Sequence, residues 1–416
     1  MHLIRGLNAT GKESGQVLVL FALWLPLLCL FVGFGIDFGF GFLTKAQLAK
    51  AVDAASLAAM RNLGRGQTEA TTIGLAEFAL NSNANSNLYV SAPSATITYS
   101  KDSSGEPIVN VAATAKIRTF FIGLAGFHTL TVANFSQATR PPIILSLVLD
   151  RSGSMNDNGG AAALPGSVTD FLGYFIENTD QLGEESFSSI ATNDVPITTA
   201  FQTPITNSVN GMAFGGATFA QGGLLDAQTQ VTGVSPLPTN AVQVVVFFTD
   251  GWANSIQATV AGSQVNFGGC APAEFAVGWC NGISCWNAAN GGSIGGTVVS
   301  SPNTAVTCDG ASTFTATDTA DLTNPASLTI NNIADEADYR AVQLANTMRS
   351  QGITVYAVGL GDKINTTYLQ ELANDPASPE YNANEPSGIF ADAPTASDLD
   401  TAFQTIASKI LLRLTH

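Results

Sequence analysis

Residues 143–155 read Ile-Ile-Leu-Ser-Leu-Val-Leu-Asp-Arg-Ser-Gly-Ser-Met. The first seven of them, Ile143–Leu149, are apolar except for Ser146, which is typical of a strand buried on both faces of a sheet. Similar apolar runs follow at Val242–Phe248 and Ile353–Val358, with apolar residues at helical spacing between the runs. Because buried strands alternate with helices, the sequence predicts the α/β class with a doubly wound, mainly parallel sheet.

Polar residues gather where these strands end. Asp150, Ser152 and Ser154 follow the first strand, Asp250 follows the second, and Thr218 lies in a glycine-rich loop between them. In open α/β sheets, ligands bind beyond the carboxyl ends of the strands, so we expect these five side chains to converge there.

Hydroxyl and carboxylate oxygens suit a divalent cation. Magnesium takes six oxygen ligands at about 2.0–2.1 Å and keeps several waters. Two hydroxyls two residues apart on one tight loop, those of Ser152 and Ser154, can occupy adjacent coordination positions. Taken alone, Asp-Arg-Ser-Gly-Ser would be an ordinary strand-to-helix turn with a capping residue. Together with Thr218 and Asp250, it is better interpreted as a metal site.

This ordered set of Asp-x-Ser-x-Ser, a distant Thr and a distant Asp resembles the metal-ion-dependent adhesion site of von Willebrand factor A domains. The resemblance covers residues 141–416. It implies that Asp150 and Asp250 bind the metal mainly through waters and that Thr218 joins when a ligand arrives. It also implies Mg²⁺ as the cofactor, or Mn²⁺ or Ca²⁺ in its place, and a protein ligand that offers a carboxylate to the cation.

Two features depart from that resemblance. In A domains the second strand is normally apolar, but the matching place, residues 182–187, reads Leu-Gly-Glu-Glu-Ser-Phe. Adjacent carboxylates fit a buried strand poorly, so we expect this strand to be shortened, shifted or exposed. The second feature is an insertion at residues 252–332, which forms either a cap on the ligand-binding rim or an inert decoration.

The insertion contains four of the five cysteines, Cys270, Cys280, Cys285 and Cys308. No histidine lies between them and no two are spaced as Cys-x-x-Cys, which disfavours a zinc site. We therefore expect two disulfides formed in an oxidising compartment, with all three connectivities open.

Nucleophilic serine catalysis is disfavoured. The three histidines, His2, His128 and His416, lie outside the predicted sheet, so no Ser-His-Asp triad is supported and we expect no enzyme. A metal-dependent hydrolase and an A-domain component of a metal-insertion chaperone are the alternatives.

The charge of the chain is unevenly distributed. The formal net charge of −16 over 416 residues disfavours nucleic acid as a partner, because phosphate binding needs a basic face. Residues 1–66 hold six basic and three acidic residues, a net of +3, which leaves −19 for the rest. A basic start followed by an acidic body indicates a membrane anchor that carries an extramembrane domain.

A predicted transmembrane anchor, residues 17–43, follows a short tail at residues 1–16. Val17–Ile36 contains 20 residues without a charge, which as a helix span roughly 30 Å, the hydrocarbon thickness of a bilayer. Pro26 is tolerated in such a helix. A cleaved secretory signal would have a shorter apolar core and a small-residue cleavage pattern, so we favour a retained single-pass anchor.

Residues 44–140 predict a juxtamembrane helix and a small β module. The helix, extending to about Leu63, carries an apolar stripe at Leu48, Val52, Ala55 and Ala59. This alanine-rich stripe packs either on its own domain, which we favour, or on other pilin-like helices. Strands are predicted at residues 96–99, 108–117 and 129–138, before a boundary at Pro141-Pro142.

The N-terminal residues also resemble a known family. Gly15–Pro26, Gly35-Ile36-Asp37 and Ala51–Ala58 are similar to the N-terminus of TadG-like Flp pilus-assembly proteins. The resemblance implies a membrane-anchored component of Flp/Tad pilus assembly or adhesion, with other pilus-assembly components among its partners.

The orientation of the anchor follows from the cysteines. Basic residues flank both sides of the span, and a simple count would place the large domain in the cytoplasm. That rule weakens for long translocated domains, whereas clustered cysteines indicate an oxidising compartment. We therefore expect a bacterial inner-membrane protein whose large domain is periplasmic or exposed on the cell surface.

Overall fold

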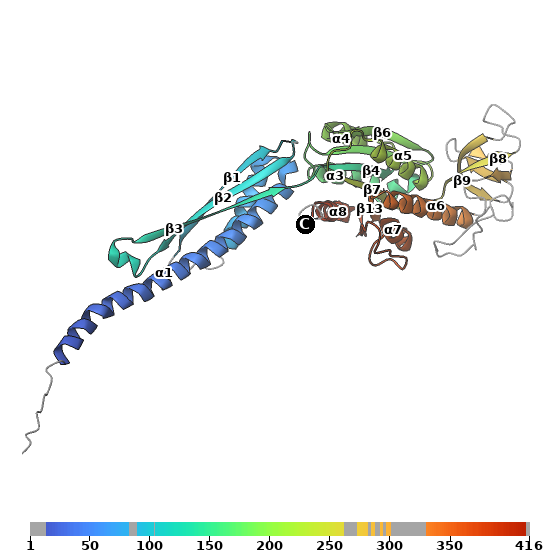
Figure 1. Cartoon of the computed structure of the whole chain (residues 1–416). Helices are drawn as coiled ribbons and strands as arrows, with labels where there is room; N and C mark the ends of the chain where they lie inside the picture. Colours follow the sequence, from blue (N-terminus) through green and yellow to red (C-terminus); the bar gives the residue numbers. More distant parts are fainter. Residues whose placement is uncertain are drawn as a thin grey trace, which may run out of the picture. The chain divides into compact units, whose positions relative to one another are not determined.

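The chain divides into two compact units (Figure 1). Apart from two short segments at 63–65 and 103–106, the first unit covers residues up to Thr139 and the second begins at Arg140. The structure is a computed structural model. It describes residues 14–82, 90–103, 105–261, 273–281, 284–287, 292–293, 297–300 and 330–412.

The first unit is built on one long helix, α1 (Ser14–Arg61), followed by α2 (Gln67–Ser82). The predicted stripe of α1 is confirmed as a buried face, since Leu48, Val52, Ala55 and Ala59 are at most 2% exposed. This face packs within its own unit, against α2 and the neighbouring strands. Helix α2 was not predicted from the sequence.

Three antiparallel strands complete this unit, in the order β1 (Val90–Lys101), β2 (Pro107–Arg118) and β3 (Thr129–Thr139). They confirm the three predicted strands and extend each of them. Along β2 the side chains alternate, with buried apolar residues facing one side and exposed residues the other. The buried residues are Val109, Val111, Ala113, Ala115 and Ile117.

The N-terminal part of α1 has an exposed apolar surface. Residues Leu18–Arg61 form the one helix within the described part of the chain that is long and apolar enough to cross a membrane. Its large side chains between Leu18 and Leu43 are mostly exposed rather than packed on protein. The core helix of a soluble protein would be mostly buried, whereas this segment has the composition and exposure of a membrane span or a signal sequence.

The second unit contains a six-stranded sheet in the order β14-β13-β7-β4-β5-β6. All neighbouring pairs are parallel except β5 and β6, which are antiparallel. The prediction of a mainly parallel sheet is confirmed, and the arrangement is consistent with a von Willebrand factor A fold. The strands are β4 (Ile143–Asp150), β5 (Gln181–Phe187), β6 (Ala191–Thr198), β7 (Val242–Thr249), β13 (Thr354–Leu360) and β14 (Phe390–Ala393).

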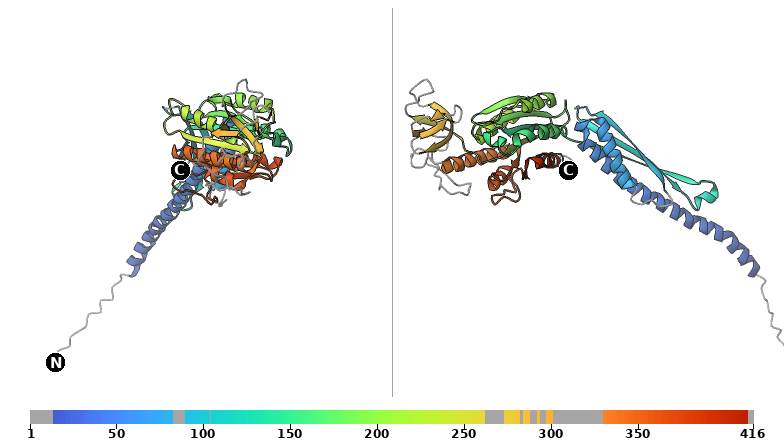
Figure 2. Two further views of the ribbon diagram at one scale, coloured as in Figure 1. Left: turned by 90° about the vertical axis from the view of Figure 1, so that its right-hand side faces the viewer. Right: turned by 180° about the vertical axis from the view of Figure 1, so that it is seen from behind.

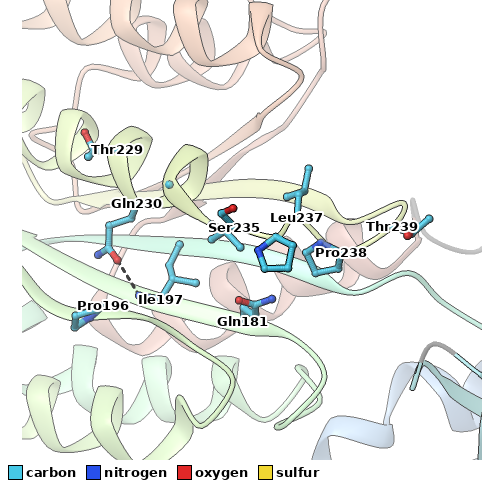
Figure 3. A pocket seen from close by; sticks show the side chains of 12 residues that line it. Gln181, Pro196, Ile197, Thr229, Gln230, Ser235, Leu237, Pro238 and Thr239 are labelled. Carbon is cyan, nitrogen blue, oxygen red and sulfur yellow. Dashed lines mark hydrogen bonds between the residues drawn. The ribbon is translucent and has the colours of Figure 1, made fainter.

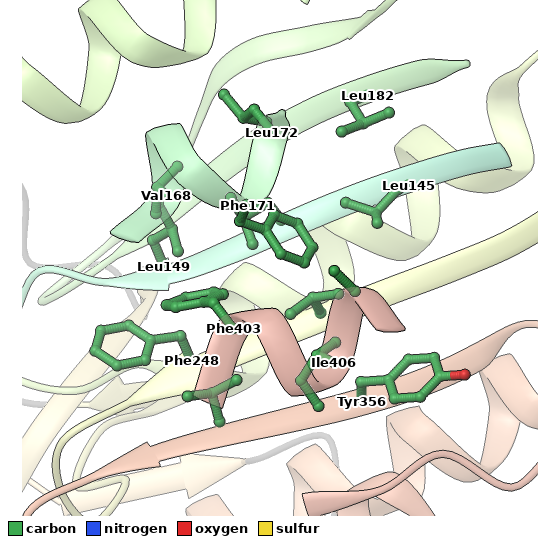
Figure 4. Packing of buried hydrophobic residues seen from close by; sticks show 14 of the residues in the cluster. Leu145, Leu149, Val168, Phe171, Leu172, Leu182, Phe248, Tyr356, Phe403 and Ile406 are labelled. Carbon is green, nitrogen blue, oxygen red and sulfur yellow. The ribbon is translucent and has the colours of Figure 1, made fainter. Parts of the chain in front are cut away.

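Helices cover both faces of this sheet and enclose two apolar cores. One core is formed with α5 (Ala220–Gly233), α6 (Ile330–Ser350) and α7 (Thr366–Ala373). The other is formed with α3 (Gly160–Leu172), α4 (Gln202–Gly211) and α8 (Leu399–Leu412). Figure 4 shows Phe171, Phe248 and Phe403 meeting in this second core.

The expectation for residues 182–187 is wrong. They form β5 at full length inside the sheet, and neither Glu184 nor Glu185 exposes any surface. Glu185 is accommodated because the Ser146 hydroxyl and the Gln230 amide each donate a hydrogen bond to its carboxyl group. Local composition misled the prediction, because these partners come from β4 and α5 rather than from neighbouring residues in the sequence.

The insertion contributes a second sheet to this unit. Its described strands are β8 (Ile256–Ala261), β9 (Ala273–Asn281), β10 (Ser284–Asn287), β11 (Gly292–Ser293) and β12 (Thr297–Ser300). Cys280 and Cys285 lie opposite each other in the β9–β10 pairing, whereas Cys270 and Cys308 lie outside the described residues. No disulfide is seen within the described part of the chain, so the two predicted disulfides stay a prediction.

Candidate metal centre

The carboxyl ends of β4 and β7 form the base of the candidate site. The two strands are parallel neighbours, with Leu149 paired to Phe248, so their ends meet at one edge of the sheet. Asp150 is the last residue of β4 and is fully buried. One of its carboxylate oxygens accepts a hydrogen bond from the Ser152 backbone N–H at 2.7 Å and the other from the Thr249 hydroxyl at 2.6 Å.

The two serine hydroxyls join the two acids. The Oγ atoms of Ser152 and Ser154 lie 3.0 Å apart, and Ser154 donates to Asp250 at 2.7 Å. The other carboxylate oxygen of Asp250 accepts a hydrogen bond from the Asn158 amide at 2.8 Å. A hydroxyl that donates its proton to a carboxylate keeps its lone pairs free for a cation.

The loop that carries Thr218 lies directly against this cluster. Gly153 N–H donates to the Gly216 carbonyl at 3.2 Å, and Gly215 N–H donates to the Arg151 carbonyl at 2.8 Å. Thr218 is itself fixed by Asn254, whose side chain accepts its backbone N–H at 2.8 Å. The recorded hydrogen bonds thus unite Asp150, Ser152, Ser154 and Asp250, while Thr218 is brought to the same edge through its backbone.

Burial of the two acids changes their protonation. The pKa of Asp150 is raised to about 7, chiefly by burial and then by the negative charge of Asp250. Burial also raises the pKa of Asp250, against the hydrogen bonds from Ser154 and Asn158. A divalent cation has the opposite effect, because it favours the ionised carboxylates.

The donor set fits a hard cation. Two carboxylates and three hydroxyls provide only oxygen, the ligand type that Mg²⁺ and Ca²⁺ prefer. No cluster of three His, Cys, Asp or Glu side chains suited to a metal occurs among the described residues. A metal at this edge would therefore depend on the hydroxyls of Ser152, Ser154 and Thr218.

Three further residues shape the site without having been predicted for it. Thr249 and Asn158 bind the two carboxylates, and Asn254 holds the backbone of Thr218. Thr249 could have been suspected because it directly precedes Asp250 at the end of a buried strand. Asn158 and Asn254 had no such signal, because an Asn in a loop is usually a turn residue.

Two cavities in the described part of the second unit differ in their distance from the candidate site. A groove of ≈ 760 Å³ runs between the start of β5, the end of β6 and the segment 229–239 (Figure 3). It lies at the amino ends of β5 and β7, away from Asp150 and Asp250. A smaller polar cleft of ≈ 400 Å³, lined by Arg151, Ser186 and Asp194 among others, borders the candidate site through Arg151.

Among family models, the comparison with known proteins finds a match in the first unit. The strand order of the six-stranded sheet is consistent with a von Willebrand factor A fold. Residues 15–62 match the family model described as "Putative Flp pilus-assembly TadE/G-like". The match covers most of α1 and does not extend into the second unit. No curated protein matches the chain.

Similar solved structures include pilus adhesins and A domains. The pilus adhesin SpaC from Lactobacillus rhamnosus GG is 16% identical with a TM-score of 0.41, over 77% of this chain and 35% of that one. The vWF domain of the type V pili tip protein Mfa5 from Porphyromonas gingivalis is 14% identical with a TM-score of 0.41, over 67% and 98%.

A third similar structure is proximal thread matrix protein 1 from the mussel byssus, with a zinc-occupied MIDAS motif. It is 14% identical with a TM-score of 0.38, over 65% of this chain and 46% of that one. The chain spans less than half the length of SpaC and of the mussel protein. These TM-scores lie below 0.5, so the three likenesses do not assign a function to this chain.

Proposed function

We propose that this chain is a membrane-anchored, TadG-like component of Flp/Tad pilus assembly or adhesion. It binds a protein partner through a metal-ion-dependent adhesion site formed by Asp150, Ser152, Ser154, Thr218 and Asp250. The observation that carries the proposal is the hydrogen-bonded cluster of two serine hydroxyls and two buried carboxylates at the ends of β4 and β7.

Each residue of the site has a separate role. Ser152 and Ser154 would hold the cation through their hydroxyl oxygens, while Asp150 and Asp250 orient these hydroxyls and balance the charge. Thr218, on its own loop, would join when a partner binds. A bound Mg²⁺ supplies an electrophilic centre that a carboxylate of the partner can approach. No catalytic residue is part of this proposal.

The anchor and the envelope location belong to the same proposal. The exposed apolar surface of α1 between Leu18 and Leu43 supports a single span in the bacterial inner membrane. The TadE/G-like match supports a setting in pilus assembly and partners from that machinery. The second unit then lies in the periplasm or on the cell surface.

Calorimetry with magnesium on the full chain in detergent tests the metal site. Wild type should bind about one Mg²⁺, and Asp150→Ala should abolish binding because it removes the carboxylate that holds the Ser152 loop. Ser152→Ala and Ser154→Ala should each weaken binding less, since each removes one neutral ligand. Thr218→Ala should spare metal binding more than partner binding.

Asp157→Ala is the matched control, because Asp157 is an exposed acid on the same loop. It should lower magnesium affinity far less than Asp150→Ala does, because its charge acts on Asp250 only at a distance. Equal losses of magnesium affinity in Asp150→Ala and Asp157→Ala would indicate that the cation is attracted by the general negative charge of this loop and not by a specific site. No heat of binding in wild type with either Mg²⁺ or Mn²⁺ would refute the metal site.

A further inference from the structure

The connection between β2 and β3 exposes large apolar side chains. We call residues 119–128 the tip; it contains a short 3₁₀ helix at Ile122–Ala125. Within the tip, Phe120 is 46% exposed, Leu124 is 82% exposed and Phe127 is 68% exposed. Exposed apolar side chains gathered on one short loop mark a contact surface rather than a random surface composition.

The tip is fixed to the membrane helix. The carboxylate of Asp37 on α1 accepts the backbone N–H groups of Phe120, Phe121 and Ile122 at 2.9, 3.0 and 2.8 Å. Asp37 is only 3% exposed. The Phe121 ring covers Gly33 so closely that a Cβ there would lie 2.2 Å from its Cγ. Figures 1 and 2 show this end of the β2–β3 pair beside α1.

These contacts set the position of the tip along the proposed membrane span. Gly33 lies in the last helical turn of the uncharged run Val17–Ile36, and Asp37 follows that run directly. Around this level, from residue 32 to residue 42, α1 exposes apolar side chains of its own, those of Val32, Ile36, Phe38 and Phe42. A bilayer that covers α1 up to this level would therefore meet the tip as well.

The charges around the tip favour a lipid surface. Residues 107–139 contain no Asp or Glu, and residues 14–52 contain only Asp37, which is buried against the tip. Lys116 and Arg118, at the end of β2 next to the tip, are exposed, as is Lys45 on α1. Basic side chains beside exposed apolar ones are typical of segments that lie in the interface of an anionic bilayer.

We propose that the tip enters the interfacial layer of the bilayer that α1 spans, as a second membrane contact of the first unit. This inference rests on the proposed anchor. Phe120, Leu124 and Phe127 lie among the outer acyl carbons, and Lys116 and Arg118 contact lipid phosphates. Asp37 is the positioning residue, because it ties the backbone of the tip to α1.

Depth-dependent quenching in nanodiscs tests the proposal on the full chain. The discs contain phosphatidylethanolamine and phosphatidylglycerol, with a nitroxide on the acyl chain either near the headgroup or near the chain end. A dansyl amino acid replaces Leu124, Cys29 or Ala112 in three separate proteins. Cys29 lies inside the proposed span, and Ala112 is an exposed position on β2, six residues before its end.

The expected pattern separates the tip from the anchor. The label at 124 should be quenched more by the shallow nitroxide, the label at 29 more by the deep one, and the label at 112 by neither. Unquenched labels at both 29 and 124 would refute the anchor itself. A quenched label at 29 with an unquenched, solvent-exposed label at 124 would refute the tip contact alone. Blue-shifted emission at 124 that grows with protein density but ignores the nitroxides would assign this surface to a second copy.

Substitution of Asp37 tests the positioning role. Asp37→Asn replaces one accepting oxygen by an amide that cannot accept, so shallow quenching at position 124 should fall while deep quenching at position 29 persists. Asp53→Asn, at an exposed acid on the same helix, is the matched control and should change neither. Unchanged quenching at 124 in Asp37→Asn would overturn this role.

Discussion

Glu184 and Glu185 are consecutive acids on a strand that is buried on both faces. Their side chains point to opposite sides of β5, as the two-residue period of a strand requires. Burial raises the pKa of each to about 8, and hydrogen bonds from Ser146 and Gln230 only partly oppose this for Glu185. The sheet therefore accommodates the two side chains largely as neutral carboxylic acids near pH 7.

The protonation of Glu185 should make the stability of the second unit depend on pH. The pKa of Glu185 is about 8 in the folded protein and near 4.5 in the unfolded chain. The contribution of its protonation to the free energy of unfolding is therefore complete below pH 4.5 and is lost as pH rises through about 8. Glu185→Gln keeps the shape and removes the titration. At pH 9 the variant should be more stable than wild type by on the order of 2 kcal/mol, measured by urea unfolding.

At pH 4 the same pair of proteins should differ little, because both then carry a neutral side chain at position 185. Asp170→Asn is the control, since Asp170 is an exposed acid on α3. Its effect on the unfolding free energy should be nearly the same at both pH values. A constant difference between Glu185→Gln and wild type across this range would show that Glu185 is already ionised in the folded protein.

At the scale of elements, the loop before α5 depends on one glycine. Gly216 has a φ of +91°, and a Cβ there would lie 2.5 Å from the Ser189 hydroxyl. Gly216→Ala should therefore cost about 1–2 kcal/mol or shift the loop. Because this loop carries Thr218, partner binding should fall more than magnesium affinity, as measured by calorimetry and a pull-down with and without EDTA.

The neighbouring Gly215→Ala is a strict control for this prediction. An added Cβ at Gly215 meets no heavy atom within 4 Å, and the residue does not require a left-handed backbone. This variant should resemble wild type in both stability and binding. If the two alanine variants behave alike, the conformation of Gly216 is not what positions Thr218.

The elements most open to prediction were those with strong local patterns. The apolar runs of β4, β7 and β13 and the stripe of α1 are visible in the sequence because burial selects their side chains directly. The ligand candidates Asp150, Ser152, Ser154 and Asp250 could be placed together because parallel strands end at one edge. The environment of Glu185 and the role of Asn158 could not be predicted from the sequence, because each depends on a partner that is distant in the chain.

The β9–β10 hairpin favours one of the three possible disulfide connectivities, the one that links Cys280 to Cys285. Opposed residues of an antiparallel pair have Cα atoms about 4.5–5.5 Å apart, which lies in the range that disulfides adopt. Since Cys280 pairs with Cys285 in register, peptide mapping of the unreduced protein should recover these two linked to each other. The bond should stabilise the hairpin by roughly 2 kcal/mol. Recovery of either cysteine linked to Cys270 or Cys308 would contradict this pairing, and Cys29 should remain a free thiol.

At the scale of the whole molecule, the two units have separate cores and differ in charge. They also differ in the function proposed for them. The first unit has its acid-poor surface near the proposed membrane, and most acidic residues lie in the second. Each unit buries its own apolar residues, such as Val52 and Ile117 in the first and Phe247 and Phe248 in the second. We therefore expect the two units to unfold in separate steps.

Magnesium should stabilise only the second of these units. A ligand that binds the folded state at a concentration 100 times its dissociation constant adds about 2.7 kcal/mol to the free energy of unfolding. In hydrogen–deuterium exchange on the full chain, amides of β4 and β7 should gain protection on adding Mg²⁺, whereas those of β2 and β3 should not.

Asp150→Ala should remove this gain without changing exchange in the first unit. A gain of equal size in both units would mean that they unfold as one cooperative body. Protection gained in the first unit alone would place the cation elsewhere on the chain. The separate response is expected because the residues of the candidate metal centre all belong to the second unit, and none of the hydrogen bonds that organise them involves the first.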